Sequence, residues 1–97
     1  MTIDKALVMK EADNVATAVQ NIAAGETVNL NLNGSLASVK MLDNIPFGHK
    51  FAIRDIADGE AVVKYGEIMG RAVKEIKTGQ HAHVHNVESC RGRGDKK

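Results

Sequence analysis

Three histidines at alternate positions are the residues of this chain best suited to chemistry. His81, His83 and His85 lie within the segment Gln-His-Ala-His-Val-His-Asn, residues 80–86. Residues two apart on a strand point to the same face, so the three imidazoles would form one stripe. Same-face neighbours lie roughly 6.5–7 Å apart, and their side chains can converge on one metal ion. The spacing predicts metal or anion binding; the competing interpretation is the solvated face of an edge strand.

Other polar residues are weaker candidates. His49 follows Gly48 in a turn-rich connector, where a histidine contacts a substrate or bonds to its own turn, and the structural role is favoured. Lys64 and Tyr65 end an apolar segment, and they would either face a cleft or cap the core. Cys90 stands beside an arginine that would favour its thiolate. It lies at the root of a polar tail, so a spare thiol is the favoured interpretation.

The composition limits the class of protein. The chain has 97 residues, which is enough for one small domain, and aromatic residues make up only 3% of it. A net charge of +1 and the absence of tryptophan argue against binding of nucleic acid. The sequence has one cysteine, no leader-like start and no apolar run near the ~20 residues that span a membrane. We therefore expect a cytoplasmic protein that binds neither nucleic acid nor membrane.

The apolar pattern predicts a mainly β fold with one short helix. Short apolar or alternating runs predict strands over residues 5–10, 27–32, 35–41, 50–56, 61–65 and 80–86. Asn33 and Gly34 predict a tight hairpin turn. A helix is predicted from an N-cap at Asp13 to a stop at Gly25, because the apolar residues between them recur at helical spacing. Many short strands favour a compact barrel-like or clip-like sheet.

A turn pattern recurs along the chain. The form Ile-X-X-Gly-Glu/Gln followed by an apolar strand occurs at residues 22–26, 56–60 and 76–80. We interpret these as three uses of one turn. The domain is predicted to cover residues 1–88, and residues 89–97 to form a flexible basic tail or docking arm, because this segment has almost no apolar residue.

Four motifs in order resemble one known family. They are Asp-Asn-Val-Ala from residue 13, Pro-X-Gly-His-Lys from residue 46, Lys-Tyr-Gly-X-X-X-Gly from residue 64 and His-X-His-X-His-Asn from residue 81. Together they resemble the N-terminal domain of the altronate and galactarate dehydratases. In other members this domain is a separate small subunit, as in (2R)-sulfolactate sulfo-lyase. The resemblance covers roughly residues 5 to 95, and the ordered set is much more specific than any one motif.

The resemblance implies a SAF-type β-clip domain in a sugar-acid lyase that eliminates water from a hydroxy acid. It implies a divalent metal, iron(II) or manganese(II), and a large catalytic subunit or domain without which this chain is inactive. The alternatives are the small subunit of a (2R)-sulfolactate sulfo-lyase, or a non-catalytic module that binds a metal or sugar acid and holds an assembly together. A homo-oligomer is also possible.

The resemblance also implies roles for the candidate residues. His83 and His85 would be catalytic, and with His81 they would bind the metal. His49, Lys64 and Tyr65 would contact the hydroxy acid.

Overall fold

The structure is a computed structural model that describes residues 5–8, 12–32 and 35–89. This part of the chain forms short strands and no helix. It holds no helix long and apolar enough to cross a membrane. The strands are β1 (Ala6–Leu7), β2 (Val15–Ala18), β3 (Thr27–Leu32), β4 (Ser35–Lys40), β5 (Lys50–Ala52), β6 (Ala61–Lys64), β7 (Glu67–Ala72), β8 (His81–Ala82) and β9 (Val87–Ser89).

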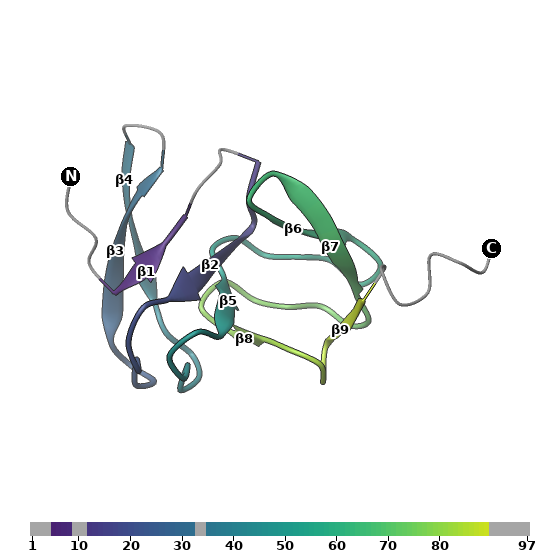
Figure 1. Cartoon of the computed structure of the whole chain (residues 1–97). Helices are drawn as coiled ribbons and strands as arrows, with labels where there is room; N and C mark the ends of the chain where they lie inside the picture. The colour runs from purple at the N-terminus through teal and green to yellow at the C-terminus, as the bar shows by residue number, and fades with distance from the viewer. Residues whose placement is uncertain (1–4, 9–11, 33–34, 90–97) are drawn as a thin grey trace.

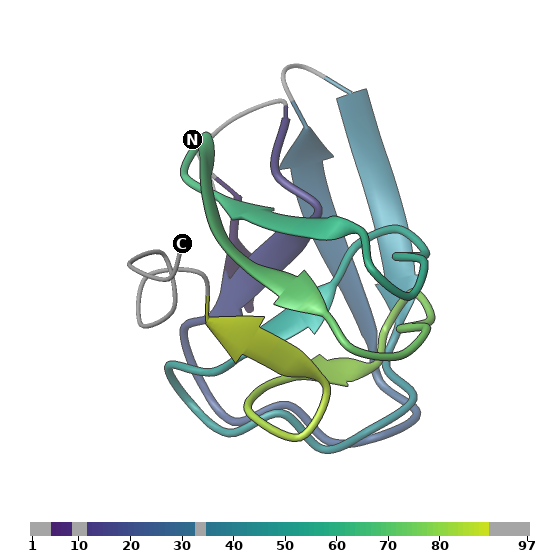
Figure 2. The ribbon, with the colours of Figure 1, turned by 90° about the vertical axis from the view of Figure 1, so that its right-hand side faces the viewer.

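The strands form three antiparallel sheets, with the largest in the middle. Its order is β1-β2-β5-β8. The hairpin β3–β4 lies on one side of it, and the sheet β6-β7-β9 lies on the other side (Figure 1). Figure 2 looks onto the second side, where β7 and β9 stand in front of the central sheet. A sheet covered on both faces must bury apolar residues on both faces.

Two apolar clusters follow from this arrangement. Ala16 of β2 pairs with Phe51 of β5, and both belong to the cluster shared with the β3–β4 hairpin. Their neighbours Val15 and Ala52 pair with each other and belong to the cluster shared with β6 and β7. Successive residues of the central strands thus pack into different clusters, because successive side chains of a strand point to opposite faces. The register of the central sheet decides which side chains face each half of the molecule.

The helix predicted from Asp13 is wrong. Val15, Ala16 and Ala18 are each 1% exposed, and they lie on strand β2 in the central sheet. A strand buried on both faces gives an almost continuous apolar run, which mimics helical spacing in a short window. Asp13 caps no helix: its Oδ1 accepts the Gly66 N–H at 2.8 Å. The rest of the fold prediction, an all-β clip-like sheet, is confirmed.

Most predicted strands are present. The strand over residues 27–32 has the predicted bounds, and it pairs along its whole length with β4. The segments 5–10, 50–56 and 61–65 contain shorter strands than predicted. The turn at Asn33 and Gly34, Cys90 and most of the predicted tail lie outside the described residues. The division of the chain at residue 88 stays a prediction.

A five-residue corner occurs four times, at residues 22–26, 45–49, 56–60 and 76–80. Each corner begins with an isoleucine that is at most 2% exposed and has at its fourth place a glycine with φ between 86° and 93°. The fifth residue donates its N–H to the carbonyl of the second. Three of these corners are the turns predicted from the sequence. The corner at residues 45–49 was missed, because its fifth residue is His49 where the other three corners have glutamate or glutamine.

The corners work in pairs. Ile22 forms a β-bridge with Ile45, and Ile56 forms one with Ile76. Each corner glycine donates its N–H to the carbonyl four residues before the partner isoleucine: Gly25 to Met41, Gly48 to Ala18, Gly59 to Ala72 and Gly79 to Ala52. The second half of the chain therefore repeats the hydrogen-bond pattern of the first half.

Candidate functional site

The histidine segment is a strand only at its start. Strand β8 contains His81 and Ala82, and a turn follows it. The N–H groups of Asn86 and Val87 both donate to the His83 carbonyl, at 3.0 and 2.8 Å. Val84, predicted to face the core, is 82% exposed. The predicted stripe of three imidazoles along one strand is therefore wrong, although the rings still gather at one place.

Asn86 holds this turn together. It is 2% exposed, and its side-chain oxygen accepts the His83 N–H at 2.9 Å. Its side-chain nitrogen donates to the His81 carbonyl at 2.8 Å. Its own carbonyl accepts the Val73 N–H at 2.9 Å, which ties the turn to the end of β7. One buried amide thus satisfies backbone groups beside two of the histidines and fixes their positions.

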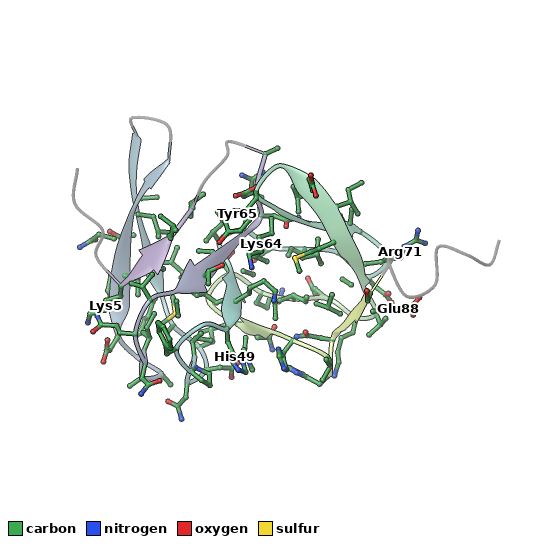
Figure 3. The ribbon with its side chains drawn as sticks, in the orientation of Figure 1. Lys5, His49, Lys64, Tyr65, Arg71 and Glu88 are labelled. Atoms are coloured by element: carbon green, nitrogen blue, oxygen red, sulfur yellow. The ribbon has the colours of Figure 1, made fainter. Side chains whose placement is uncertain are left out.

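His49 joins the histidines from a distant part of the sequence. It ends the second corner, directly before β5, and the pairing of Lys50 with Ala82 and of Phe51 with His81 brings it opposite His83. The rings of His49 and His83 stack with centroids 4.4 Å apart. His49 Nδ1 lies 3.0 Å from His81 Nε2. Figure 3 shows His49 at the end of β5 that faces the histidine turn.

Pro46 explains why a histidine can occupy this place. In two other corners the fifth residue, Glu60 or Gln80, uses its side-chain oxygen to accept the N–H of the second residue at 2.8 Å. In the corner that ends at His49 the second residue is Pro46, which has no N–H to satisfy. The His49 side chain therefore does not have to accept an N–H within its own corner, and its ring lies against His81 and His83.

Three imidazoles form the centre of the site. His49, His81 and His83 each offer one ring nitrogen, and these nitrogens all lie within 4.8 Å of one another. All three residues are half-buried. His85 is exposed, and its ring centroid lies 5.4 Å from that of His81 at an angle of 40°. We call His49, His81 and His83 the histidine cluster; His85 stands at its edge.

The surroundings favour neutral imidazoles. Burial lowers the pKa of His81 below its ordinary value, and the rings of His49, His83 and His85 lower it further. Asp43, whose carboxylate accepts the backbone N–H of His81 at 2.9 Å, opposes this shift. Burial also lowers the pKa of His83, followed by the effects of His49, Lys50 and His85. A neutral imidazole has the free lone pair that a metal ligand needs.

Lys64 and Tyr65 lie apart from the histidine cluster. They stand at the turn between β6 and β7, away from His49 (Figure 3). The Lys64 ammonium lies 4.8 Å from the centre of the Tyr65 ring. Together with Glu67, Ile68, Met69 and Ser89 they line a hollow of about 280 Å³. Tyr65 has a φ of 57°, an uncommon value for a residue other than glycine.

A second hollow lies beside His83 and shares two lining residues with the first. It has a volume of about 170 Å³ and is lined by Lys50, Met69, His83, Val84, Val87 and Ser89. Met69 and Ser89 also line the hollow that contains Lys64 and Tyr65. Lys50 was not among the residues predicted from the sequence. The signal was its place directly after His49 in the Pro-X-Gly-His-Lys motif.

Comparison with known proteins gives consistent matches. Residues 4–90 match the family model described as the altronate/galactarate dehydratase SAF domain. The chain is 38% identical over 96 residues to a (2R)-sulfolactate sulfo-lyase subunit alpha from Chromohalobacter salexigens, covering 94% of this chain and 99% of that one. It is 38% and 39% identical over 77 residues to the altronate dehydratases of Bacillus subtilis and Escherichia coli. These matches cover 79% of this chain but 15% of each dehydratase.

Proposed function

Because the chain belongs to the altronate/galactarate dehydratase SAF-domain family, we propose that it is the small component of a lyase that acts on a hydroxy acid, in an active site completed by a larger partner. The single observation that carries this proposal is the histidine cluster. It places three imidazole nitrogens within 4.8 Å of one another at the surface of a domain from a family of lyases.

The proposal of a larger partner rests on size and exposure. The hollow beside His83 measures about 170 Å³ and is partly open, whereas sites that enclose a ligand usually measure ~300–1,000 Å³. In the altronate dehydratases, a segment like this chain makes up 15% of the protein. The sulfolactate relative is named as subunit alpha. We therefore propose that this chain supplies one wall of the site and has little activity alone.

The donor set fits a divalent metal. A metal bound by imidazoles at about 2.1 Å needs ring nitrogens roughly 3 Å apart when they are neighbours around it. His49 Nδ1 and His81 Nε2 meet this distance at 3.0 Å. Imidazole suits iron(II) and manganese(II) as well as zinc. We propose that His49, His81 and His83 hold the ion. This replaces the prediction in which His85 was a ligand and His49 contacted the substrate.

The chemistry that follows is a β-elimination. A base removes the proton α to the carboxylate, the electron pair of that C–H bond forms a carbon–carbon double bond, and the hydroxyl on the β carbon takes up a proton and leaves as water. A bound metal would supply positive charge that polarises the leaving group and stabilises the negative charge of the carboxylate. His85 is the exposed imidazole at the edge of the cluster, and we propose that it exchanges the proton.

Elimination of sulfite is the second candidate. The observation in its favour is coverage: the match spans 99% of the sulfolactate relative and only 15% of each altronate dehydratase. The electron flow is the same, because sulfite leaves the β carbon in place of water. A module that binds metal without turnover is the remaining alternative.

The test is reconstitution with the partner. The chain is expressed with the large lyase subunit with which it co-purifies, and the complex is assayed on D-altronate, galactarate and (2R)-sulfolactate. We expect turnover of one of these acids, and a loss of at least 100-fold in kcat/KM when His81 and His83 are both replaced by alanine. Lys74→Ala, an exposed change elsewhere, is the control. Full activity of the double variant would contradict the proposal, and no turnover with intact metal binding would favour the non-catalytic module.

A further inference from the structure

We infer that Lys50 forms an anion site with the hollow beside His83, and that this site holds the carboxylate of the hydroxy acid. The identity of the anion rests on the proposed function; the existence of the site rests on the geometry of Lys50 alone.

The register of the central sheet fixes where Lys50 points. Lys50 stands on β5 between Thr17 of β2 and Ala82 of β8. Residues directly opposite each other in antiparallel strands share a face. Ala82 is buried in the cluster shared with β6 and β7, so Lys50 extends toward that half of the molecule. Its neighbour Phe51 points to the other half.

The hollow that Lys50 enters has apolar and neutral polar walls. Met69 of β7 and Val87 of β9 line it, together with Ser89, His83 and Val84. No acidic side chain lines it. The two ion pairs found within residues 5–8, 12–32 and 35–89 join Lys5 to Glu26 and Lys77 to Glu75, so neither includes Lys50.

Lys50 therefore carries a charge without an anionic partner in the described structure. The side chain is half-buried, and it lines a hollow that has no acidic side chain. A partly desolvated ammonium without a counter-charge is an unfavourable arrangement by itself. A bound anion would compensate this charge, which is the usual way in which such a site is completed.

The size of the hollow selects a small anion. About 170 Å³ suits an acid group with a few carbon atoms and is too small for a nucleotide. With its acid group at Lys50, a hydroxy acid would place the next carbon atoms toward His83, because both residues line the same hollow. Removal of the α proton drives electrons onto the carboxylate. The Lys50 ammonium would stabilise that added charge where it develops.

The experiment is a titration of the metal-free chain followed by NMR. Labelled chain in EDTA receives D-altronate, the neutral polyol altritol, acetate or inorganic phosphate. We expect saturable shifts of the Lys50, His83 and Ser89 amides with altronate in the millimolar range, and none with altritol. Lys50→Met should raise the Kd for altronate at least 10-fold, and Lys74→Met, an exposed lysine, should leave it unchanged. If Lys50→Met loses the dispersed spectrum of the fold, Lys50→Gln replaces it.

The outcomes separate the site from the proposed function. Absence of saturable shifts up to 100 mM, or equal affinity in the Lys50 variant, would overturn the inference. Equal affinity for phosphate and acetate would overturn the assignment to a hydroxy acid and reduce the site to a general anion site. If Lys50→Met weakens binding but the complex turns over none of the acids, the site stands and the lyase proposal fails. If the complex is active and Lys50→Met leaves its KM unchanged, the lyase stands and this inference fails.

Discussion

His49 Nδ1 lies 3.0 Å from His81 Nε2, although the two residues are 32 positions apart in the sequence. The contact exists because the second corner ends at His49 and the β5–β8 register aligns it with the histidine segment. Two ring nitrogens at this distance share one proton in the metal-free chain, or direct both lone pairs at one ion. The cluster seen in the structure therefore includes His49, whereas the ligand set predicted from the sequence consisted of His81, His83 and His85.

Replacing His49 tests that distinction. We expect His49→Ala to lower the affinity for manganese(II) or zinc as strongly as His81→Ala does, by about 100-fold for the loss of one of three ligands, within the range known for metal-site changes. His85→Ala should change it less than about 3-fold, because His85 lies outside the group of converging nitrogens. Isothermal titration of the three variants measures this. A stronger effect of His85 than of His49 would restore the ligand set predicted from the sequence.

The stability of the metal-free chain should fall on acidification. The pKa values of His81 and His83 are lowered in the folded chain relative to their ordinary value of 6.5. Between the lowered values and 6.5 the unfolded chain binds more protons, so the free energy of unfolding rises with pH in that window. It should be highest above about pH 7 and decrease as the pH falls through 6.5 and below.

Urea denaturation in EDTA at several pH values measures this dependence. The double variant His81→Gln, His83→Gln should show a flatter profile over the same range. An unchanged slope in that variant would assign the pH dependence to other groups.

Asn86 should matter for both stability and metal binding. Asn86→Ala leaves the His83 N–H and the His81 carbonyl without their side-chain partner. We expect a loss of roughly 2–3 kcal/mol in the free energy of unfolding, the cost of unpaired buried groups, and at least a 10-fold weaker metal affinity. Asn44→Ala is the matched control, because Asn44 accepts one hydrogen bond at an exposed corner.

Denaturation and metal titration of the two asparagine variants decide this. Asn44→Ala should lose about 1 kcal/mol or less, as expected for an exposed hydrogen bond, and should keep its metal affinity. Equal metal affinity in both variants would show that the turn at residues 83–86 forms without the Asn86 amide.

Gly79 should be the least replaceable corner glycine. Its φ is +89°, and a Cβ at this position would collide with the Lys40 carbonyl. Gly25 has a φ of +93° but open space around it. We expect Gly25→Ala to lose about 1–2 kcal/mol from backbone strain alone, and Gly79→Ala to lose clearly more. Thermal unfolding of the two variants makes the comparison, and equal losses would mean that the chain near Lys40 shifts freely.

The sequence predicted correctly those strands that bury one face and expose the other to solvent. Strand β3 alternates apolar and polar residues, and its bounds were predicted correctly. Strand β2 was mistaken for a helix because Val15, Ala16 and Ala18 are buried on both faces. Alternation cannot report a strand of that kind.

The candidate site was predicted in part for a similar reason. Alternate histidines predicted a clustering of imidazoles, but not the turn, because the buried Asn86 amide overrides the strand pattern through hydrogen bonds to residues three and five positions before it. His49 was ranked behind the other histidines because its partners lie more than 30 residues away. The corner at residues 45–49 is the feature that would have identified His49. When it is aligned with the other three corners, His49 takes the place equivalent to Gln80.

The corner with Pro46 separates architecture from chemistry. Isoleucine and glycine fix the backbone of every corner, so the fifth side chain can vary without altering the path of the chain. In the corners ending at Glu60 and Gln80 the fifth side chain accepts the N–H of the second residue. Pro46 has no backbone N–H, so at this corner the fifth side chain has no hydrogen bond to accept. The position is still fixed by the corner, and His49 occupies it with an imidazole that belongs to the histidine cluster. Pro46→Ala would restore a backbone N–H at this corner, and that N–H would compete with the histidine cluster for the His49 ring. Pro46 would therefore influence the cluster without contacting a ligand.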